Sequence, residues 1–158
     1  MDKLELKTVL FPTDFADLSD HALAYARSFA ECFGAKLHVI HVVDEAYQYW
    51  MAMGPSSLPV GPRPEELVSG SQQTMAAYIQ EHLADTKLEV ETKVLVGRPF
   101  MEIIRFAREK KIDLIVMGTH GRGTISHALM GSVAEKVVRK APCPVLTIRH
   151  PEHEFAMP

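Results

Sequence analysis

The sequence predicts an α/β fold: a single domain built on an open, parallel sheet of five strands with helices on both faces. Short apolar runs alternate with segments of helical periodicity along the chain, so successive strands are joined by crossovers rather than by hairpin turns. The 158 residues, 47% of them apolar, suffice for one core and are too few for two ordinary domains. Such crossovers are right-handed in about 98% of known cases, which leaves few topologies.

The predicted strands differ in the burial that their residues indicate. Three are continuous apolar runs typical of buried strands, Thr8–Phe11, Leu37–Val43 and Leu114–Met117, and Val145–Ile148 closes the fold. Residues 88–96 alternate instead, and their inward-facing set is expected to be Leu88, Val90, Val94 and Val96. One solvated face predicts a strand near the edge of the sheet.

The predicted helices carry apolar residues at helical spacing. Residues 19–33 place four side chains on one stripe, and Gly34 is a natural stop just beyond. Further helices are expected after residue 64, from Pro99, and over residues 132–140. The stripe of the first helix comprises Ala22, Ala26, Phe29 and Phe33, and the shared face of the second comprises Ala76, Ile79 and Leu83.

Two segments break this rhythm. Residues 44–64 contain four prolines and two glycines, so a long loop is predicted there within a domain that spans residues 1–150. Residues 151–158 are predicted to form a flexible C-terminal tail. A pair of histidines at this end of the chain, His150 just before the tail and His153 within it, lacks the supporting contacts of a metal site.

Composition excludes several classes of function. A net charge of -3 and a pI near 6.2 argue against a basic face for nucleic acid. No apolar stretch approaches the roughly 20 residues that a membrane-spanning helix needs, and the N-terminal apolar run is too short for a signal peptide. Two cysteines, Cys32 and Cys143, do not make a disulfide framework. We therefore expect a cytoplasmic protein with no membrane insertion and no nucleic-acid partner.

The loop after the first strand is one candidate binding segment, because ligands of open parallel sheets bind beyond the carboxyl ends of the strands. It reads Pro12-Thr13-Asp14. Asp14 can accept hydrogen bonds from a ribose or from an exocyclic amine. The alternative is that Asp14 only orders the turn into the first helix.

The loop after the fourth strand is the second candidate. Its glycines allow positive φ angles and let backbone amides come close to a ligand. Ser132 and Glu135 form an S-x-x-E pattern that predicts a capping box at the start of the last helix. A helix start preceded by Gly131 suits phosphate oxygens, although Ser132 could be a helix cap and nothing more.

The spacing of this loop carries a family resemblance. Gly118, Gly121, Gly131 and Ser132 realise G-x2-G-x9-G-S, and here the chain resembles the ATP-binding branch of the universal stress proteins. Other landmarks of that family extend the resemblance over nearly the whole chain, apart from residues 46–64 and the tail. These landmarks are Phe11–Phe15, His41–Asp44, Gly97–Pro99, Asp113–Gly118 and Pro142–Leu146. The resemblance implies a Rossmann-like fold, close to that of the adenine nucleotide alpha hydrolases.

The resemblance also implies ATP as the ligand, with Mg²⁺ beside the triphosphate, although the sequence shows no dedicated metal-ligand cluster. Pro12, Thr13 and Asp14 would contact the adenosine, and Val42 would offer its backbone to the adenine edge. The nucleotide-lining and phosphate-holding residues would be Met117, Gly118, Gly121, Arg122, Gly131, Ser132 and Val133. Ala134 stands where some ATP-binding relatives carry a hydroxyl residue.

No catalytic residue is predicted. The sequence contains no P-loop lysine motif and no kinase H-R-D or D-F-G motif, and His120 and His127 are more simply surface or packing residues of the loop. The leading hypothesis is a nucleotide-dependent regulatory module of the stress response with little or slow hydrolysis and a possible protein partner. The alternatives are an adenylating or ATP-hydrolysing enzyme, and a dimerisation module with an empty site. The choice among ATP, ADP and a cyclic nucleotide stays open.

A homodimer is also predicted. With strand order 3-2-1-4-5 the last strand lies at an edge of the sheet, and its residues do little to block pairing with a second copy. Similar proteins dimerise through this strand. The expected interface comprises Val145, Leu146, Thr147 and Ile148.

Overall fold

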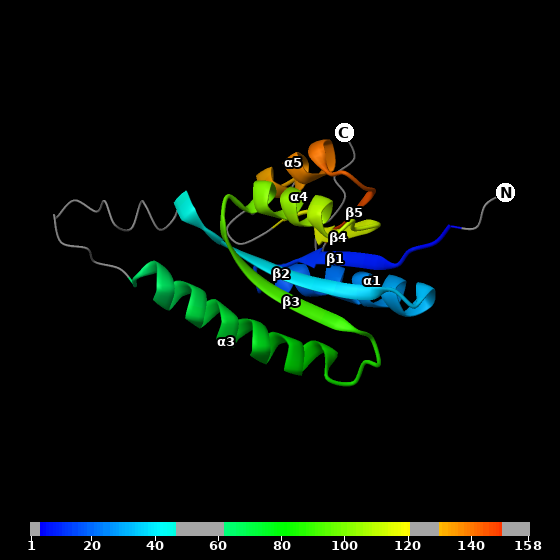
Figure 1. Cartoon of the computed structure of the whole chain (residues 1–158), viewed down its shortest axis with the longest axis horizontal. Coiled ribbons are helices and arrows are strands. Elements are labelled where there is room, and N and C mark those ends of the chain that lie inside the picture. Colours follow the sequence, from blue (N-terminus) through cyan, green and yellow to red (C-terminus); the bar gives the residue numbers. More distant parts are fainter. Residues whose placement is uncertain (1–3, 47–61, 121–129, 150–158) are drawn as a thin grey trace.

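The computed structural model describes residues 4–46, 62–120 and 130–149. Its strands and helices alternate as the sequence predicts (Figure 1). In chain order they are β1 (Thr8–Pro12), α1 (Asp17–Phe33), β2 (Lys36–Asp44), α3 (Pro64–Leu83), β3 (Val90–Gly97), α4 (Pro99–Glu109), β4 (Leu114–Gly118), α5 (Ser132–Lys140) and β5 (Val145–Ile148). Residues 47–61 of the predicted loop and the predicted tail lie outside the described residues.

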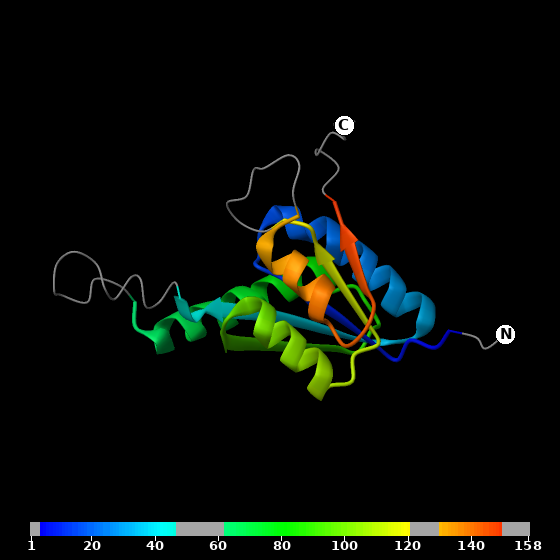
Figure 2. The same ribbon diagram turned by 90° about the horizontal axis from the view of Figure 1, so that it is seen from above.

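The five strands form one parallel sheet in the order β3-β2-β1-β4-β5, which confirms the predicted fold class. Strand order reverses between β1 and β4, so the chain leaves these two neighbouring strands toward different sides. Helices α1 and α3 cover one face and α4 and α5 cover the other (Figure 1). Figure 2 shows β4 and β5 side by side at one edge. The point of reversal places the ends of β1 and β4 together.

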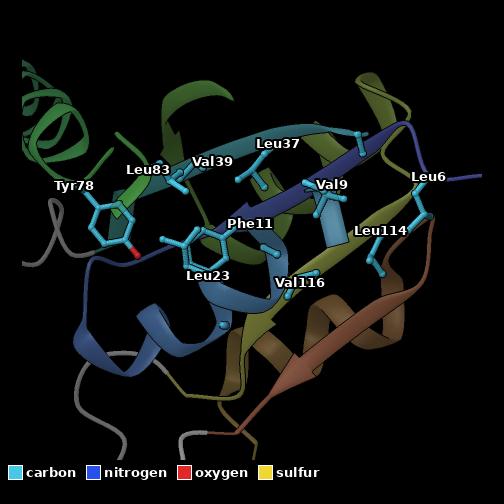
Figure 3. Close-up of a cluster of buried hydrophobic side chains, with 14 of the residues drawn as sticks. Leu6, Val9, Phe11, Leu23, Leu37, Val39, Tyr78, Leu83, Leu114 and Val116 are labelled. Atoms are coloured by element: carbon cyan, nitrogen blue, oxygen red, sulfur yellow. The ribbon is translucent and has the colours of Figure 1, made fainter. Parts of the chain in front are cut away.

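Side chains of the central strands alternate between two cores. Val9 and Phe11 of β1 belong to the core that lies toward α1 and α3, which also contains Leu23 and Tyr78 (Figure 3). Leu10, between them, belongs to the second core, under α4 and α5. Because both faces of the central strands are covered, these strands need apolar residues at every position, which is why their sequences show runs rather than alternation.

The prediction of an inward-facing side chain is wrong for three residues. Phe33 of α1 is 38% exposed and Val96 of β3 is 43% exposed, while Ala76 of α3 lies on the exposed side of its helix. Phe33 is the last residue of its helix, and Val96 is near the end of an edge strand that has a neighbour on one side only. In α3 the buried residues are Met75, Tyr78 and Leu83, so the buried face is centred about one residue away from the predicted one.

The helix boundaries follow local signals. Gly34 ends α1 with a φ of 63°, a left-handed conformation that suits glycine, and Pro64 and Pro99 each occupy the first turn of a helix. Among the helices that the structure describes, none combines the length and the hydropathy needed to cross a bilayer.

His38 of β2 is the buried polar side chain that the second core leaves unsatisfied. It is 3% exposed, its ring packs on Phe106, and its Nδ1 has no hydrogen-bond partner among the described residues. Burial lowers the pKa of His38, and Lys36 and Lys110 lower it further, against the opposing effect of Glu91. The folded protein therefore favours the neutral imidazole.

We expect the free energy of unfolding to fall as pH drops below about 6.5, the usual pKa of histidine in an unfolded chain. The unfolded chain then binds a proton that folded His38 does not, so protonation favours unfolding. The His38→Leu variant should lose this contribution, which is at most about 1.4 kcal/mol per pH unit for one proton. Urea denaturation of both proteins between about pH 7 and pH 5 measures it, and parallel pH profiles would contradict it.

A second acid-sensitive group acts in a separate pH range. Lys36 and Lys110 hydrogen-bond to Glu91 and hold its pKa at about 2. The contribution of Glu91 to the free energy of unfolding is present above the ordinary pKa of a glutamate, about 4.3, and is lost as pH falls toward 2. The titration of Glu91 therefore lies below the pH range in which the effect of His38 is measured.

Candidate functional site

The chain leaves β1 through a turn that is fixed by backbone and side-chain hydrogen bonds. Thr13 N donates to the Ile40 carbonyl at 2.9 Å, the last contact of this kind between β1 and β2. The Asp14 Oδ1 atom accepts from Ala16 N at 3.0 Å, so Asp14 does order the turn, as the simpler alternative proposed. Phe15 then adopts a φ of 61°, a left-handed conformation that is uncommon outside glycine.

Thr13 is committed to the interior of the protein. Thr13 is only 6% exposed, and its Oγ1 accepts a hydrogen bond from Phe15 N at 3.0 Å. The Ser19 hydroxyl donates to the Ala16 carbonyl at 2.7 Å, so at the 3.2 Å contact between the two hydroxyls Thr13 is the donor. The Thr13 hydroxyl is therefore already engaged in hydrogen bonds within the protein, and its contact with a ligand stays a prediction.

The neighbouring strand β2 extends past the end of β1. Pro12, the last residue of β1, pairs with Ile40, and Val42 lies two residues further along β2. Ile40 directs its carbonyl toward β1, and alternate residues of a strand direct their backbone groups to the same side. Val42 therefore presents its N–H and C=O to the space beyond β1, next to the Thr13–Asp14 turn. This is the position from which a backbone could meet the edge of a planar base.

The chain leaves β4 along the opposite wall of this space. Met117 is 6% exposed and packs in the core under α4 and α5, so its side chain is a structural element rather than a lining group. A Cβ on Gly118 would meet the His120 carbonyl at 3.5 Å and the Leu18 carbonyl at 3.7 Å. Thr119 follows, 7% exposed, and its N–H donates to the Ile148 carbonyl of β5 at 3.0 Å.

Gly131 joins the two ends of the glycine-bearing loop. Its N–H donates to the Thr119 carbonyl at 2.7 Å, and a Cβ at this position would lie only 2.9 Å from the same oxygen. Its φ is -57°, so the requirement for glycine here is close approach of two backbones rather than a positive φ. Gly121 and Arg122, predicted to hold the phosphates, lie outside the described residues, as does His127.

The predicted capping box at Ser132 is wrong. Gly131 is the N-cap of α5, none of the side chains that the structure describes caps the helix, and the Gly131 carbonyl accepts from Glu135 N at 3.0 Å. The bond from Gly131 to Thr119 fixes the start of the helix one residue before the position that the box requires. Ser132 is exposed, and the N–H groups of Ser132, Val133 and Ala134 have no intrahelical acceptor. These groups lie at the positive end of the helix dipole.

Two residues that were not predicted to belong to the site, His41 and Thr119, hold its backbone segments in place. His41 Nδ1 lies 2.8 Å from the Thr13 carbonyl, and the His41 ring packs on Phe15 at 4.4 Å. Thr119 anchors the loop through its carbonyl. His38 packs on Phe106 on the other face, so the two histidines of β2 lie on opposite faces of the sheet. Among the described residues, no group of three or more His, Cys, Asp or Glu could hold a metal ion.

Comparison with known proteins places this geometry in a family. The model of the universal stress protein family matches residues 5–149. The chain belongs to the universal stress protein family. Universal stress protein MJ0531 of Methanocaldococcus jannaschii is 36% identical over 149 residues, which cover 94% of this chain and 85% of that protein. A universal stress protein of Thermus aquaticus is 35% identical over 144 residues, covering 90% and 98%.

Solved structures of the family share the fold. The structure of MJ0577 from M. jannaschii superposes with a TM-score of 0.77 at 27% identity and covers 94% of this chain and 99% of that one. A universal stress protein in complex with cAMP gives a TM-score of 0.59 at 24% identity, covering 92% and 98%. The Archaeoglobus fulgidus protein in complex with dAMP gives 0.59 at 24%, covering 93% and 100%.

Proposed function

We propose that this universal stress protein binds an adenine nucleotide, ATP in the first place, and acts in the cytoplasm as a nucleotide-dependent regulatory module of the stress response. One observation carries the proposal: the 2.7 Å bond from Gly131 to the Thr119 carbonyl, with no room for a Cβ at Gly131. This bond brings the start of α5, which no described side chain caps, to the point where strand order reverses. Backbone N–H groups at such a helix start suit phosphate oxygens.

The opposite wall offers groups that suit an adenosine. The backbone of Val42 faces the space beyond β1, and the ordered turn at Asp14 borders it. Mg²⁺ would arrive with the triphosphate and neutralise part of its charge. The cAMP and dAMP complexes of structurally similar family members support a purine nucleotide as the ligand class. The lack of a P-loop lysine in the sequence supports binding without rapid hydrolysis.

Isothermal titration calorimetry with ATP plus Mg²⁺, ADP and cAMP tests the proposal, together with chromatography of nucleotide released when the purified protein is denatured. We expect binding with a Kd on the order of 10 µM or tighter, about -7 kcal/mol. Absence of both binding heat and released nucleotide would refute nucleotide binding. Formation of AMP and pyrophosphate in a steady-state assay would instead favour the adenylating enzyme.

We also propose a homodimer through β5. This strand lies at the edge of the sheet, and Val145, Leu146, Thr147 and Ile148 are all partly exposed and uncharged. The carbonyls of Pro144 and Ile148 bond toward β4, so the intervening odd-numbered residues direct their backbone groups to the open edge. An apolar strand with an open row of N–H and C=O groups favours pairing with a second copy.

The Thr147→Pro variant removes one N–H group from the open edge and leaves the bonds to β4 in place. We expect the parent protein to sediment as a dimer at micromolar concentration and Thr147→Pro as a monomer. Thr147→Val keeps the N–H group and serves as the matched control that remains dimeric. A monomeric parent, or a dimeric proline variant, would argue against this interface.

A further inference from the structure

Phe15 forms the least relaxed part of the turn after β1. Its φ of 61° is disfavoured for a residue with a bulky side chain, so the surrounding contacts must hold it. Its N–H donates to Thr13 Oγ1. Its ring lies between two aromatic partners, His41 of β2 at 4.4 Å and Tyr78 of α3 at 5.6 Å.

His41 holds this turn by a hydrogen bond as well as by packing. A carbonyl oxygen only accepts, so the 2.8 Å contact with the Thr13 carbonyl requires a proton on Nδ1 of His41. The His41 ring is tilted by 30° against the Phe15 ring. One side chain therefore contacts the backbone at the start of the turn and the ring at its strained position.

Tyr78 supports Phe15 from the other side. The two rings meet edge to face at 62°, and Tyr78 is 7% exposed. Its hydroxyl donates to Asp20 Oδ1 of α1 at 2.7 Å, and burial together with this carboxylate raises the pKa of Tyr78, so that the phenol stays protonated. Phe15 is thus fixed between β2 and the helical layer.

We propose that His41 is a positioning residue for the bound nucleotide. It immediately precedes Val42, whose backbone faces the space beyond β1, and its imidazole fixes the Thr13–Asp14 turn that borders the same space. His41 therefore sets the spacing between the two backbone segments that would enclose the adenosine. The inference rests on the proposed nucleotide binding and adds a residue that has no direct contact with the ligand.

Three variants separate the functions of the imidazole. His41→Phe keeps an aromatic ring against Phe15 and removes the N–H donor. His41→Asn keeps an N–H donor near the place of Nδ1 and removes the ring. His38→Leu, three residues earlier on the same strand, changes a histidine on the opposite face and is the matched control. For each protein we would measure the Kd for ATP plus Mg²⁺ by calorimetry and the urea midpoint without nucleotide.

We expect the Kd to rise about tenfold in His41→Phe, the effect of one lost hydrogen bond, and to stay within about threefold of the parent in His41→Asn and His38→Leu. A merely structural role would shift the urea midpoint of both His41 variants and leave their Kd unchanged. The inference is overturned if His41→Phe binds as the parent does, or if the other two variants weaken binding equally. If the parent protein does not bind ATP, the proposed function itself is refuted. This outcome is seen in the parent without any variant, so it is distinguishable from a failure of the inference about His41.

Discussion

Replacing Gly131 by valine is expected to weaken ATP binding at least about a hundredfold and to lower the free energy of unfolding by about 1–3 kcal/mol. A Cβ at this position would lie 2.9 Å from the Thr119 carbonyl, and backbone cannot rotate away as a side chain can. Thr119 and the start of α5 would have to separate, and the N–H groups of α5 would move away from the proposed phosphate position. Calorimetry and urea denaturation measure the two effects.

Gly70, in the interior of α3, provides the matched control. A Cβ there would meet no atom within 4 Å, and alanine has a higher helix propensity than glycine. Gly70→Ala should therefore raise the free energy of unfolding by up to about 1 kcal/mol and leave the Kd unchanged. If Gly131→Val bound ATP as tightly as Gly70→Ala, the phosphate position proposed for the start of α5 would be wrong.

Phe11→Ala is expected to have the largest effect on stability, a loss of about 3–5 kcal/mol. Phe11 is fully buried in the core between the sheet and the α1 and α3 layer, and truncation leaves a cavity that the rigid sheet cannot fill (Figure 3). This loss is a large part of the roughly 5–15 kcal/mol that stabilises an ordinary domain. The urea midpoint should fall accordingly, or the variant should fail to accumulate as folded protein.

Phe33→Ala makes the same chemical change at a residue that is 38% exposed at the end of α1. Here we expect a loss of less than about 1 kcal/mol, because the side chain is partly exposed to solvent and its ring stacks on Phe29 of the same helix. Equal losses in the two variants would mean that the core does not depend on β1 in the way the packing indicates.

The sheet could be predicted from the sequence because its signals are local. Buried parallel strands leave continuous apolar runs, and the alternation over residues 88–96 indicated an edge strand, which β3 is. The exposed positions of Phe33, Ala76 and Val96 could not be predicted. Each depends on how far a helix or strand extends past its neighbours and on the exact rotation of a helix, and neither is encoded in spacing alone.

The site could be predicted in part. Glycine spacing identified Gly131, but the reason for a glycine there is the approach of Thr119, which belongs to a different part of the loop. The S-x-x-E pattern at Ser132 gave a wrong prediction of a capping box, because the contact between Gly131 and Thr119 makes Gly131 the N-cap. His41 belongs to the family landmark His41–Asp44, but nothing in the sequence indicated a positioning role for it. Its contact with the Thr13 carbonyl depends on the end of β1 lying beside β2, which only the assembled sheet provides.

The join between Thr119 and Gly131 has an evolutionary consequence. One backbone bond, from Gly131 N–H to the Thr119 carbonyl, holds β4 and the start of α5 together, and it leaves no room for a Cβ at position 131. Any side chain there would push the two backbones apart, so we expect selection to keep glycine at this position.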